Sequence, residues 1–201
     1  MTTNSERPFA AQFPKKPEVG DEVIVKGKLL SNAKVFSVNF ILPHPPPPNQ
    51  NAEPMPPELG EQPSTPEPCC GRPSGTHNHQ KSSPPYIAYH FKTVFEGDED
   101  DEGVVVQNWK NVVWQQEHRS PNTWLRDRRQ RFSLIFRFHQ DTIRVFVDHA
   151  HHGPDYEFEY QVPLDRIRYI ELWDDVEFVE EVTFRFKSLR DRFQEEVNES
   201  Y

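Results

Sequence analysis

The stretch that decides the fold reads VVVQNWKNVVWQQEHR and runs from Val104 to Arg119. It opens with a β-branched run, which favours an extended strand. We expect an inner strand pair here, with a polar face that carries Asn108, Trp114, Glu117 and Arg119. A carboxamide, an indole, a carboxylate and a guanidinium grouped in this way suit a ligand covered in hydroxyl groups, because together they supply an apolar platform, donors and acceptors.

Short apolar or alternating segments surround this stretch on both sides. They recur about every 8–12 residues with no helical pattern of any length between them, which is typical of an antiparallel sandwich. The sequence therefore predicts an all-β fold, a two-sheet antiparallel β-sandwich. The further strands are expected over residues 9–13, 22–29, 34–42, 85–95, 131–138, 142–148, 156–160, 168–174 and 176–186.

The composition changes abruptly over residues 43–85, which hold 14 of the 20 prolines. Such a segment buries too little apolar area to offset its ordering entropy, so we interpret it as a disordered loop insertion. The alternative is a docking site for proline-recognising modules. His77 and His79 follow Cys69 and Cys70 in this segment, but their spacing fits no compact zinc finger, and we expect no metal site there.

The remaining boundaries follow from this insertion. Residues 1–8 are expected to be a flexible N-terminus. Residues 9–186 are expected to form one domain interrupted by residues 43–85, and the charged tail over 187–201 is expected to fray or form a short helix.

Charge and cysteine content limit the classes of partner. The net charge of −9 argues against nucleic acid and against anionic membranes. No segment approaches the roughly 18 apolar residues of a membrane span. We therefore expect synthesis in the cytosol and no insertion into a membrane. The only cysteines are adjacent, at Cys69 and Cys70, which leaves no disulfide framework and fits a reducing compartment.

The order of motifs resembles the galectin carbohydrate-recognition domain from about Phe9 to Phe186, once the proline-rich segment is set aside. The fragments that carry the resemblance are 19–21 with 24–27, 35–40, 87–91, 105–108, 114–119, 145–148, 158–160 and 163–167. The resemblance implies a two-sheet sandwich with a β-galactoside groove, no cofactor, no metal and no catalysis. It also implies cytoplasmic residence together with an extracellular location reached by unconventional secretion.

The first sugar motif of the family, His-x-Asn-x-Arg, is altered in this chain. His90 remains, Lys92 stands where the family has Asn, and Val94 replaces Arg. A hydrogen bond to a charged group contributes roughly 1.5–3 kcal/mol, so these two changes remove about 3 kcal/mol. That is on the order of a hundredfold in affinity. Lys92 also introduces a cation that could meet a sulfated or sialylated glycan.

The other two motifs are present. Val-x-Asn ends at Asn108, and Trp-x-x-Glu-x-Arg supplies Trp114, Glu117 and Arg119. The resemblance implies that Trp114 carries the apolar face of galactose, that His90, Asn108 and Glu117 bond its hydroxyls, and that Arg119 donates while holding Glu117. The alternatives for these residues are structural: a core Trp114, a solvated Glu117–Arg119 pair, and a strand His90 packed against its neighbours.

The leading hypothesis is a galectin-type lectin for galactose-containing glycans with altered or weakened specificity. The alternative is a galectin-fold protein-interaction module that has lost sugar binding and engages proteins through residues 43–85. An enzyme is not expected. His90, Glu117 and Asp148 include acid–base groups, but the sequence offers no nucleophile motif and no paired-carboxylate arrangement.

Overall fold

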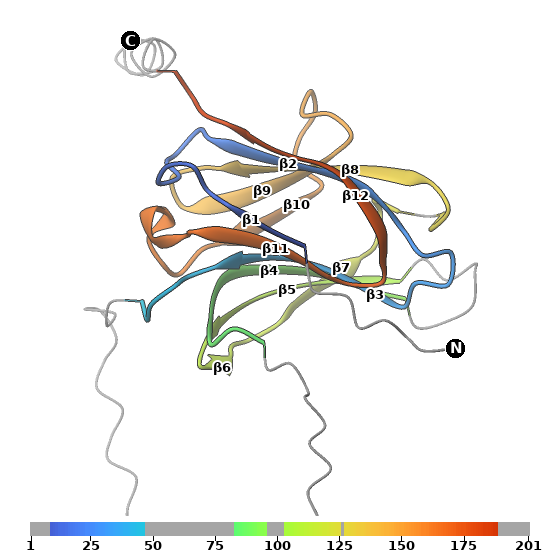
Figure 1. The fold of residues 1–201 in the computed structure, drawn as a ribbon, viewed down its shortest axis with the longest axis horizontal. Coiled ribbons are helices and arrows are strands. Elements are labelled where there is room, and N and C mark those ends of the chain that lie inside the picture. Colours follow the sequence, from blue (N-terminus) through green and yellow to red (C-terminus); the bar gives the residue numbers. More distant parts are fainter. Residues whose placement is uncertain (1–8, 47–82, 96–102, 126, 189–201) are drawn as a thin grey trace, which may run out of the picture. The chain divides into compact units, whose positions relative to one another are not determined.

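The computed structural model describes residues 9–46, 83–95, 103–125 and 127–188. The expected flexible N-terminus, the greater part of the proline-rich insertion (47–82) and most of the charged tail (189–201) lie outside the described residues. The described residues form two antiparallel sheets that lie one over the other (Figure 1). The predicted all-β sandwich is confirmed.

One sheet has seven strands, in the order β1-β11-β3-β4-β5-β6, with β7 also paired to β5. Its strands are β1 (Phe9–Gln12), β3 (Val35–Ile41), β4 (Tyr86–Val94), β5 (Val104–Asn111), β6 (Val113–Trp114), β7 (His118–Pro121) and β11 (Tyr169–Asp174). The proline-rich insertion joins β3 to β4, which are neighbours in this sheet, as the resemblance implies.

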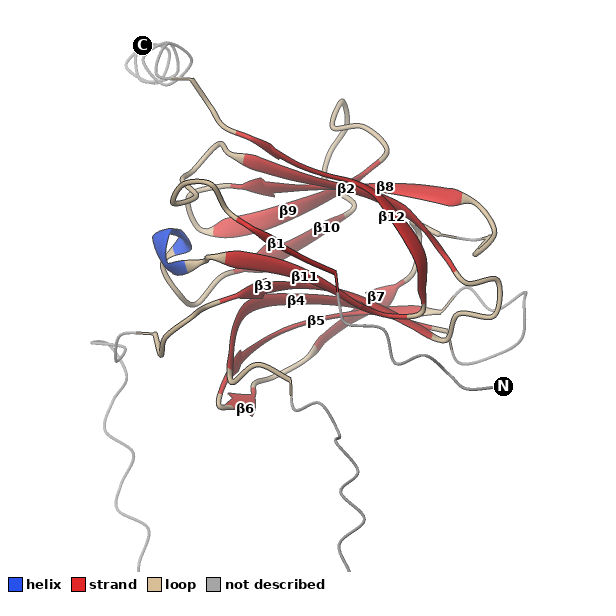
Figure 2. Cartoon of the chain, viewed as in Figure 1, coloured by secondary structure: helices blue, strands red, loops and turns tan. Residues whose placement is uncertain are grey.

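The other sheet has five strands, in the order β10-β9-β8-β2-β12. They are β2 (Glu22–Leu29), β8 (Arg131–Phe138), β9 (Thr142–Val147), β10 (Tyr156–Glu159) and β12 (Val176–Arg185). Among the described residues the only helical element is the short 3-10 turn η1 (Leu164–Arg166), drawn blue in Figure 2.

Alternation along the strands builds the core between the sheets and turns most polar side chains to the opposite face of each sheet, although Ile24, Ile135 and Phe146 form a small apolar cluster on the outer face of the five-stranded sheet. In β3, Phe36, Val38 and Phe40 are fully buried in the core. The ring of Phe40 lies 5.2 Å from that of Phe136 on the facing sheet. The residues between them in β3 therefore face away from the core and form part of the candidate site.

The expected inner strand pair over Val104–Arg119 is only half right. β5 is an inner strand. The edge of the sheet next to it is formed by two short strands, β6 and β7, which pair with different parts of β5. Between these two short strands, the Asn108 amide donates to the carbonyl oxygen of Gln115 at 3.0 Å. The polar stretch consequently lies at the rim of the sheet rather than at its centre.

Candidate carbohydrate-binding groove

The polar face of the seven-stranded sheet is centred on β4. His90 lies opposite Asn39 of β3 and opposite Asn108 of β5, and directly opposed residues project from the same face of a sheet. The structure thus brings the first and second sugar motifs together, as the resemblance implies.

Trp114 lies beside this row at the edge of the sheet. Its side chain is 42% exposed, so the core alternative for Trp114 is wrong. The indole centroid is 4.6 Å from that of His90 at an interplanar angle of 50°, and the Lys110 ammonium lies 5.3 Å from an indole ring centroid. These contacts hold the indole beside the row while leaving much of its surface open to a ligand.

Glu117 and Arg119 form a solvent-exposed ion pair, as the structural alternative for these two residues predicts. The Arg119 Nε and Nη2 atoms both donate to Oε2 of Glu117, at 3.1 and 2.9 Å. Both side chains remain about half exposed. Because Oε2 of Glu117 accepts both bonds, Oε1 of Glu117 and Nη1 of Arg119 have hydrogen-bonding capacity left.

Asn108 is buried, and its amide also serves the chain itself. Its Oδ1 accepts from the Trp109 backbone N–H at 2.7 Å, while Nδ2 donates to Gln115. A carboxamide nitrogen carries two hydrogens, so one donor remains after the bond to Gln115. Asn108 therefore shapes the turn that carries Trp114 in addition to offering that donor.

Lys92 and Val94 project from the same face as His90. Lys92 is half-buried and lies opposite Ser37 of β3 and Val106 of β5. Val94, between Val35 and Val104, gives this end of the face an apolar side chain. The altered half of the first motif is thus part of the polar face, next to His90.

A buried polar chain runs from His90 into β3. Nδ1 of His90 is 2.5 Å from Oδ1 of Asn39, and the Asn39 amide donates to the Ser37 hydroxyl at 3.3 Å. Ser37 donates in turn to Oδ2 of Asp174 at 3.0 Å. Burial, and after it the nearby Lys92 ammonium, lowers the pKa of His90 from 6.5 to about 3, so the ring is neutral at physiological pH.

Sequence reasoning missed Asn39, Ser37 and Asp174. The signal for the first two was the alternation in the segment 35–42, whose polar residues necessarily face away from the core. Asp174 offered no local signal. The groove face also continues onto β11, where Trp173 Nε1 donates to Glu171 at 2.8 Å.

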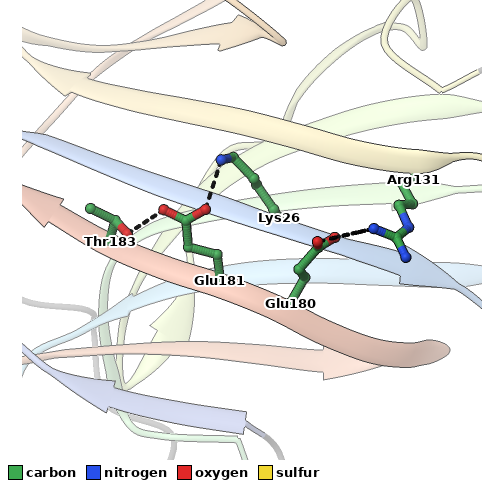
Figure 3. A network of polar contacts seen from close by, with 5 residues as sticks. All are labelled: Lys26, Arg131, Glu180, Glu181 and Thr183. Atoms are coloured by element: carbon green, nitrogen blue, oxygen red, sulfur yellow. Dashed lines mark hydrogen bonds and ion pairs between the residues drawn. The ribbon is translucent and has the colours of Figure 1, made fainter.

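The opposite surface of the sandwich, the outer face of the five-stranded sheet, is also polar but is organised differently. Glu181 accepts from Lys26 and Thr183, and Glu180 accepts from Arg131 (Figure 3). A hollow of about 350 Å³ lies on this face over Ile24 and Ile135, next to the loop of His149 and His151.

Within the described part of the chain, no group of three His, Cys, Asp or Glu side chains is arranged to hold a metal ion. No helix in that part is long and apolar enough to cross a membrane.

Comparison with known proteins places this geometry in a family. The family model for galactoside-binding lectins matches residues 76–184, more than half of the chain. No curated protein sequence matches.

Three solved structures share the fold at 17–18% sequence identity. Sheep galectin-11, in complex with glycerol, has a TM-score of 0.55 over 89% of this chain and 98% of its own. For galectin LEC-6 of Caenorhabditis elegans the TM-score is 0.57, with 90% and 92% covered. For Xenopus laevis galectin-Ib it is 0.56, with 89% and 100% covered. The polar face, its Trp-x-x-Glu-x-Arg motif and the family match agree: the chain belongs to the galactoside-binding lectin family.

Proposed function

We propose that the protein binds neutral galactose-containing glycans, weakly, in the groove formed by His90, Lys92, Asn108, Trp114, Glu117 and Arg119. The observation that carries this proposal is the exposed Trp114 indole beside a neutral, buried His90. An indole face takes up the C–H face of a galactose unit at little entropic cost, and the neighbouring polar groups pair with its hydroxyls.

The charge of the groove supports a neutral ligand. Among the described residues, the ionised side chains on this face are three cations (Lys92, Lys110 and Arg119) and three anions (Glu117, Glu171 and Asp174), whose charges sum to zero. Lys92 interacts electrostatically with Asp174, so an anionic substituent near Lys92 would also meet a carboxylate. We therefore expect Lys92 to act as a hydroxyl donor rather than as a sulfate site.

Weak affinity follows from Val94, which has no donor where the family has a guanidinium. The loss of a charged donor costs roughly 1.5–3 kcal/mol, or about ten- to a hundredfold in affinity. Lys92 supplies donors but lacks the acceptor of an Asn side chain.

An NMR titration of the full chain tests the proposal. Lactose should give saturable shifts in β4 to β7, whereas maltose, a disaccharide without galactose, should give none. Trp114→Ala should abolish the lactose shifts, while Trp173→Phe serves as the control for an indole elsewhere on the same face. If neither lactose nor a sulfated lactose gives saturable shifts, the proposal is wrong; much tighter binding of the sulfated sugar would overturn the neutral-ligand part alone.

A second candidate is a galectin-fold protein-interaction module, which Val94 favours because it removes a sugar contact. Pull-downs with the full chain and with a variant lacking residues 47–82 separate the two candidates. Loss of the captured partners on deletion supports the module; identical partners argue against a role for the insertion.

A further inference from the structure

We propose that Asp174, acting through Ser37 and Asn39, fixes the tautomer of His90 so that Nε2 offers an unprotonated lone pair to the groove. The positioning of His90 concerns the protein alone, while its effect on sugar affinity rests on the proposed function. Ser37, Asn39 and Asp174 are positioning residues in this scheme, because they act on a ligand only through His90.

The direction of each hydrogen bond follows from the chemistry of Asp174. An ionised carboxylate only accepts, so the Ser37 hydroxyl donates its single hydrogen to Asp174, at 3.0 Å. The Ser37 oxygen is then available to Asn39 only as an acceptor. The Asn39 group that approaches it at 3.3 Å must therefore be the amide nitrogen.

This orientation of the amide determines the proton on His90. With Nδ2 of Asn39 turned to Ser37, its Oδ1 faces Nδ1 of His90 at 2.5 Å and can only accept. Nδ1 therefore carries the hydrogen. A neutral imidazole has one N–H, so Nε2 is left as an acceptor.

Burial protects the Asn39 and Ser37 links of this chain, while Asp174 itself is solvent-exposed. Asn39 is 0% exposed and Ser37 1% exposed, so solvent does not compete for their polar groups. Within the described residues, Asn39 is the only hydrogen-bond partner of the His90 ring. Nε2 is thus left for a ligand hydroxyl.

Asp174 is the last residue of β11, just before the chain crosses to β12 in the other sheet. Its register partner is the core residue Phe36, so a regular strand would direct the carboxylate into the core. A φ of 77° turns it instead so that it reaches Ser37. The following carboxylate, Asp175, fixes this turn by accepting from the backbone N–H groups of Lys34 and Val35 at 2.7 and 3.1 Å.

The inference defines what the ligand must present. A sugar oxygen that contacts Nε2 has to donate its hydrogen, so a free hydroxyl is accepted there, whereas an O-methyl ether at the same oxygen has no hydrogen to give. The groove discriminates at this point by hydrogen-bond direction, in addition to shape.

Nitrogen-15 NMR of the imidazoles in the ligand-free full chain tests the tautomer directly, with His90→Gln identifying the His90 signals. The wild type should show the Nδ1–H form. Ser37→Ala removes the link and should give a mixture of both tautomers, while Ser37→Thr, which keeps a hydroxyl, should restore the wild-type pattern. Thr183→Ala is the matched control, because it removes a hydroxyl that donates to a carboxylate on the other sheet.

Two variants of Asp174 provide an independent test should Ser37→Ala fail to fold. Asp174→Asn tolerates a positive φ, but its amide can donate to Ser37 as well as accept from it, so the bond direction is no longer fixed and both tautomers should appear. Asp174→Gly also tolerates the φ but has no acceptor, and it should behave like Ser37→Ala. A pure Nδ1–H pattern in Ser37→Ala and Asp174→Gly would overturn the inference.

Lactose titrations of the same proteins give the consequence for binding. Ser37→Ala, Asp174→Asn and Asp174→Gly should weaken lactose binding in proportion to the fraction of the Nδ1–H tautomer that is lost, about twofold for an equal mixture, whereas Thr183→Ala should leave the affinity unchanged. If the wild type does not bind lactose, the proposed function fails while the NMR result still decides the tautomer.

Discussion

The groove face of the seven-stranded sheet and the outer face of the five-stranded sheet are both rich in polar side chains, yet they differ in how those side chains are satisfied. On the outer face, Lys26–Glu181 and Arg131–Glu180 are ion pairs with side chains 38–67% exposed (Figure 3). On the groove face, Ser37, Asn39 and His90 are buried and bonded in series.

The difference indicates where the chemistry of the protein resides. Exposed pairs satisfy each other, contribute little to stability and leave little for a ligand. Breaking a buried series of hydrogen bonds, such as that of Ser37, Asn39 and His90, lowers stability more than breaking an exposed pair. The series also leaves one hydrogen-bonding group, Nε2 of His90, for a ligand. The following predictions test this contrast, beginning with the largest effect.

Asn39→Ala should lower the free energy of unfolding by about 2–3 kcal/mol, because it leaves the buried Nδ1–H of His90 without an acceptor. Urea denaturation followed by circular dichroism measures the change. Glu180→Ala is the matched outer-face variant and should leave the midpoint where it is. Equal, small effects of the two substitutions would remove the energetic distinction between the faces.

Acid should destabilise the protein through His90. The pKa of His90 is about 3 in the folded chain against 6.5 as its ordinary value, so the unfolded chain binds more protons between these two pH values. The contribution of His90 to stability is therefore complete above pH 6.5 and is lost as the pH falls toward 3, by at most about 1.4 kcal/mol per pH unit.

Denaturation of the wild type and of His90→Gln at several pH values isolates this contribution, since the other titrating groups are common to both proteins. The difference in unfolding free energy should shrink as the pH falls below 6.5. Because His90 stays neutral, lactose affinity should be nearly flat between pH 8 and 5.5. A steep fall in affinity across that range would contradict a neutral, buried imidazole.

Arg119→Ala should separate binding from stability. The pair with Glu117 is about half exposed, so its loss should change the unfolding free energy by less than about 1 kcal/mol. Lactose affinity should nevertheless fall about tenfold, because a charged donor and the orientation of Glu117 are lost together. A matching loss of stability would assign the pair a structural role instead.

The smallest effect is expected from Arg131→Ala on the outer face. Its ion pair with Glu180 is exposed, so the unfolding free energy should change by less than about 0.5 kcal/mol, with lactose affinity unaffected. Any change in lactose binding would show that the two faces are coupled across the core.

The strands and the sandwich could be predicted from sequence because alternation is a local property. In β3, three large apolar residues alternate with Ser37 and Asn39, which places those two on the face away from the core. The candidate site residues on and beside β5 to β7 could be predicted in the same way, because Asn108, Trp114, Glu117 and Arg119 follow one another closely in the chain.

The other half could not be predicted, because its contacts depend on strand register and on one turn. Ser37 and Asp174 are 137 residues apart and meet only when β11 pairs with β3. The direction of the Asp174 side chain depends further on a positive φ, which sequence spacing does not encode. Pattern reasoning also placed β6 and β7 inside the sheet, since alternation does not indicate which strand is the last.

The way the sheets end bears on how the chain behaves at high concentration. An unpaired strand edge is a template on which another copy can add a strand, and proteins limit this by shortening or distorting such edges. Among the described residues, β1, β7 and β10 have four residues each and β6 has two.

The one long edge strand, β12, is interrupted by two register shifts against β2. Between the two shifts, where Gly27 pairs with Val179, the strands approach so closely that a Cβ atom at Gly27 would lie 2.6 Å from the Phe178 carbonyl oxygen. No edge in the described part of the chain therefore offers a long, flat ladder to a neighbour. The protein carries a built-in protection against edge-to-edge aggregation that is separate from anything its groove recognises.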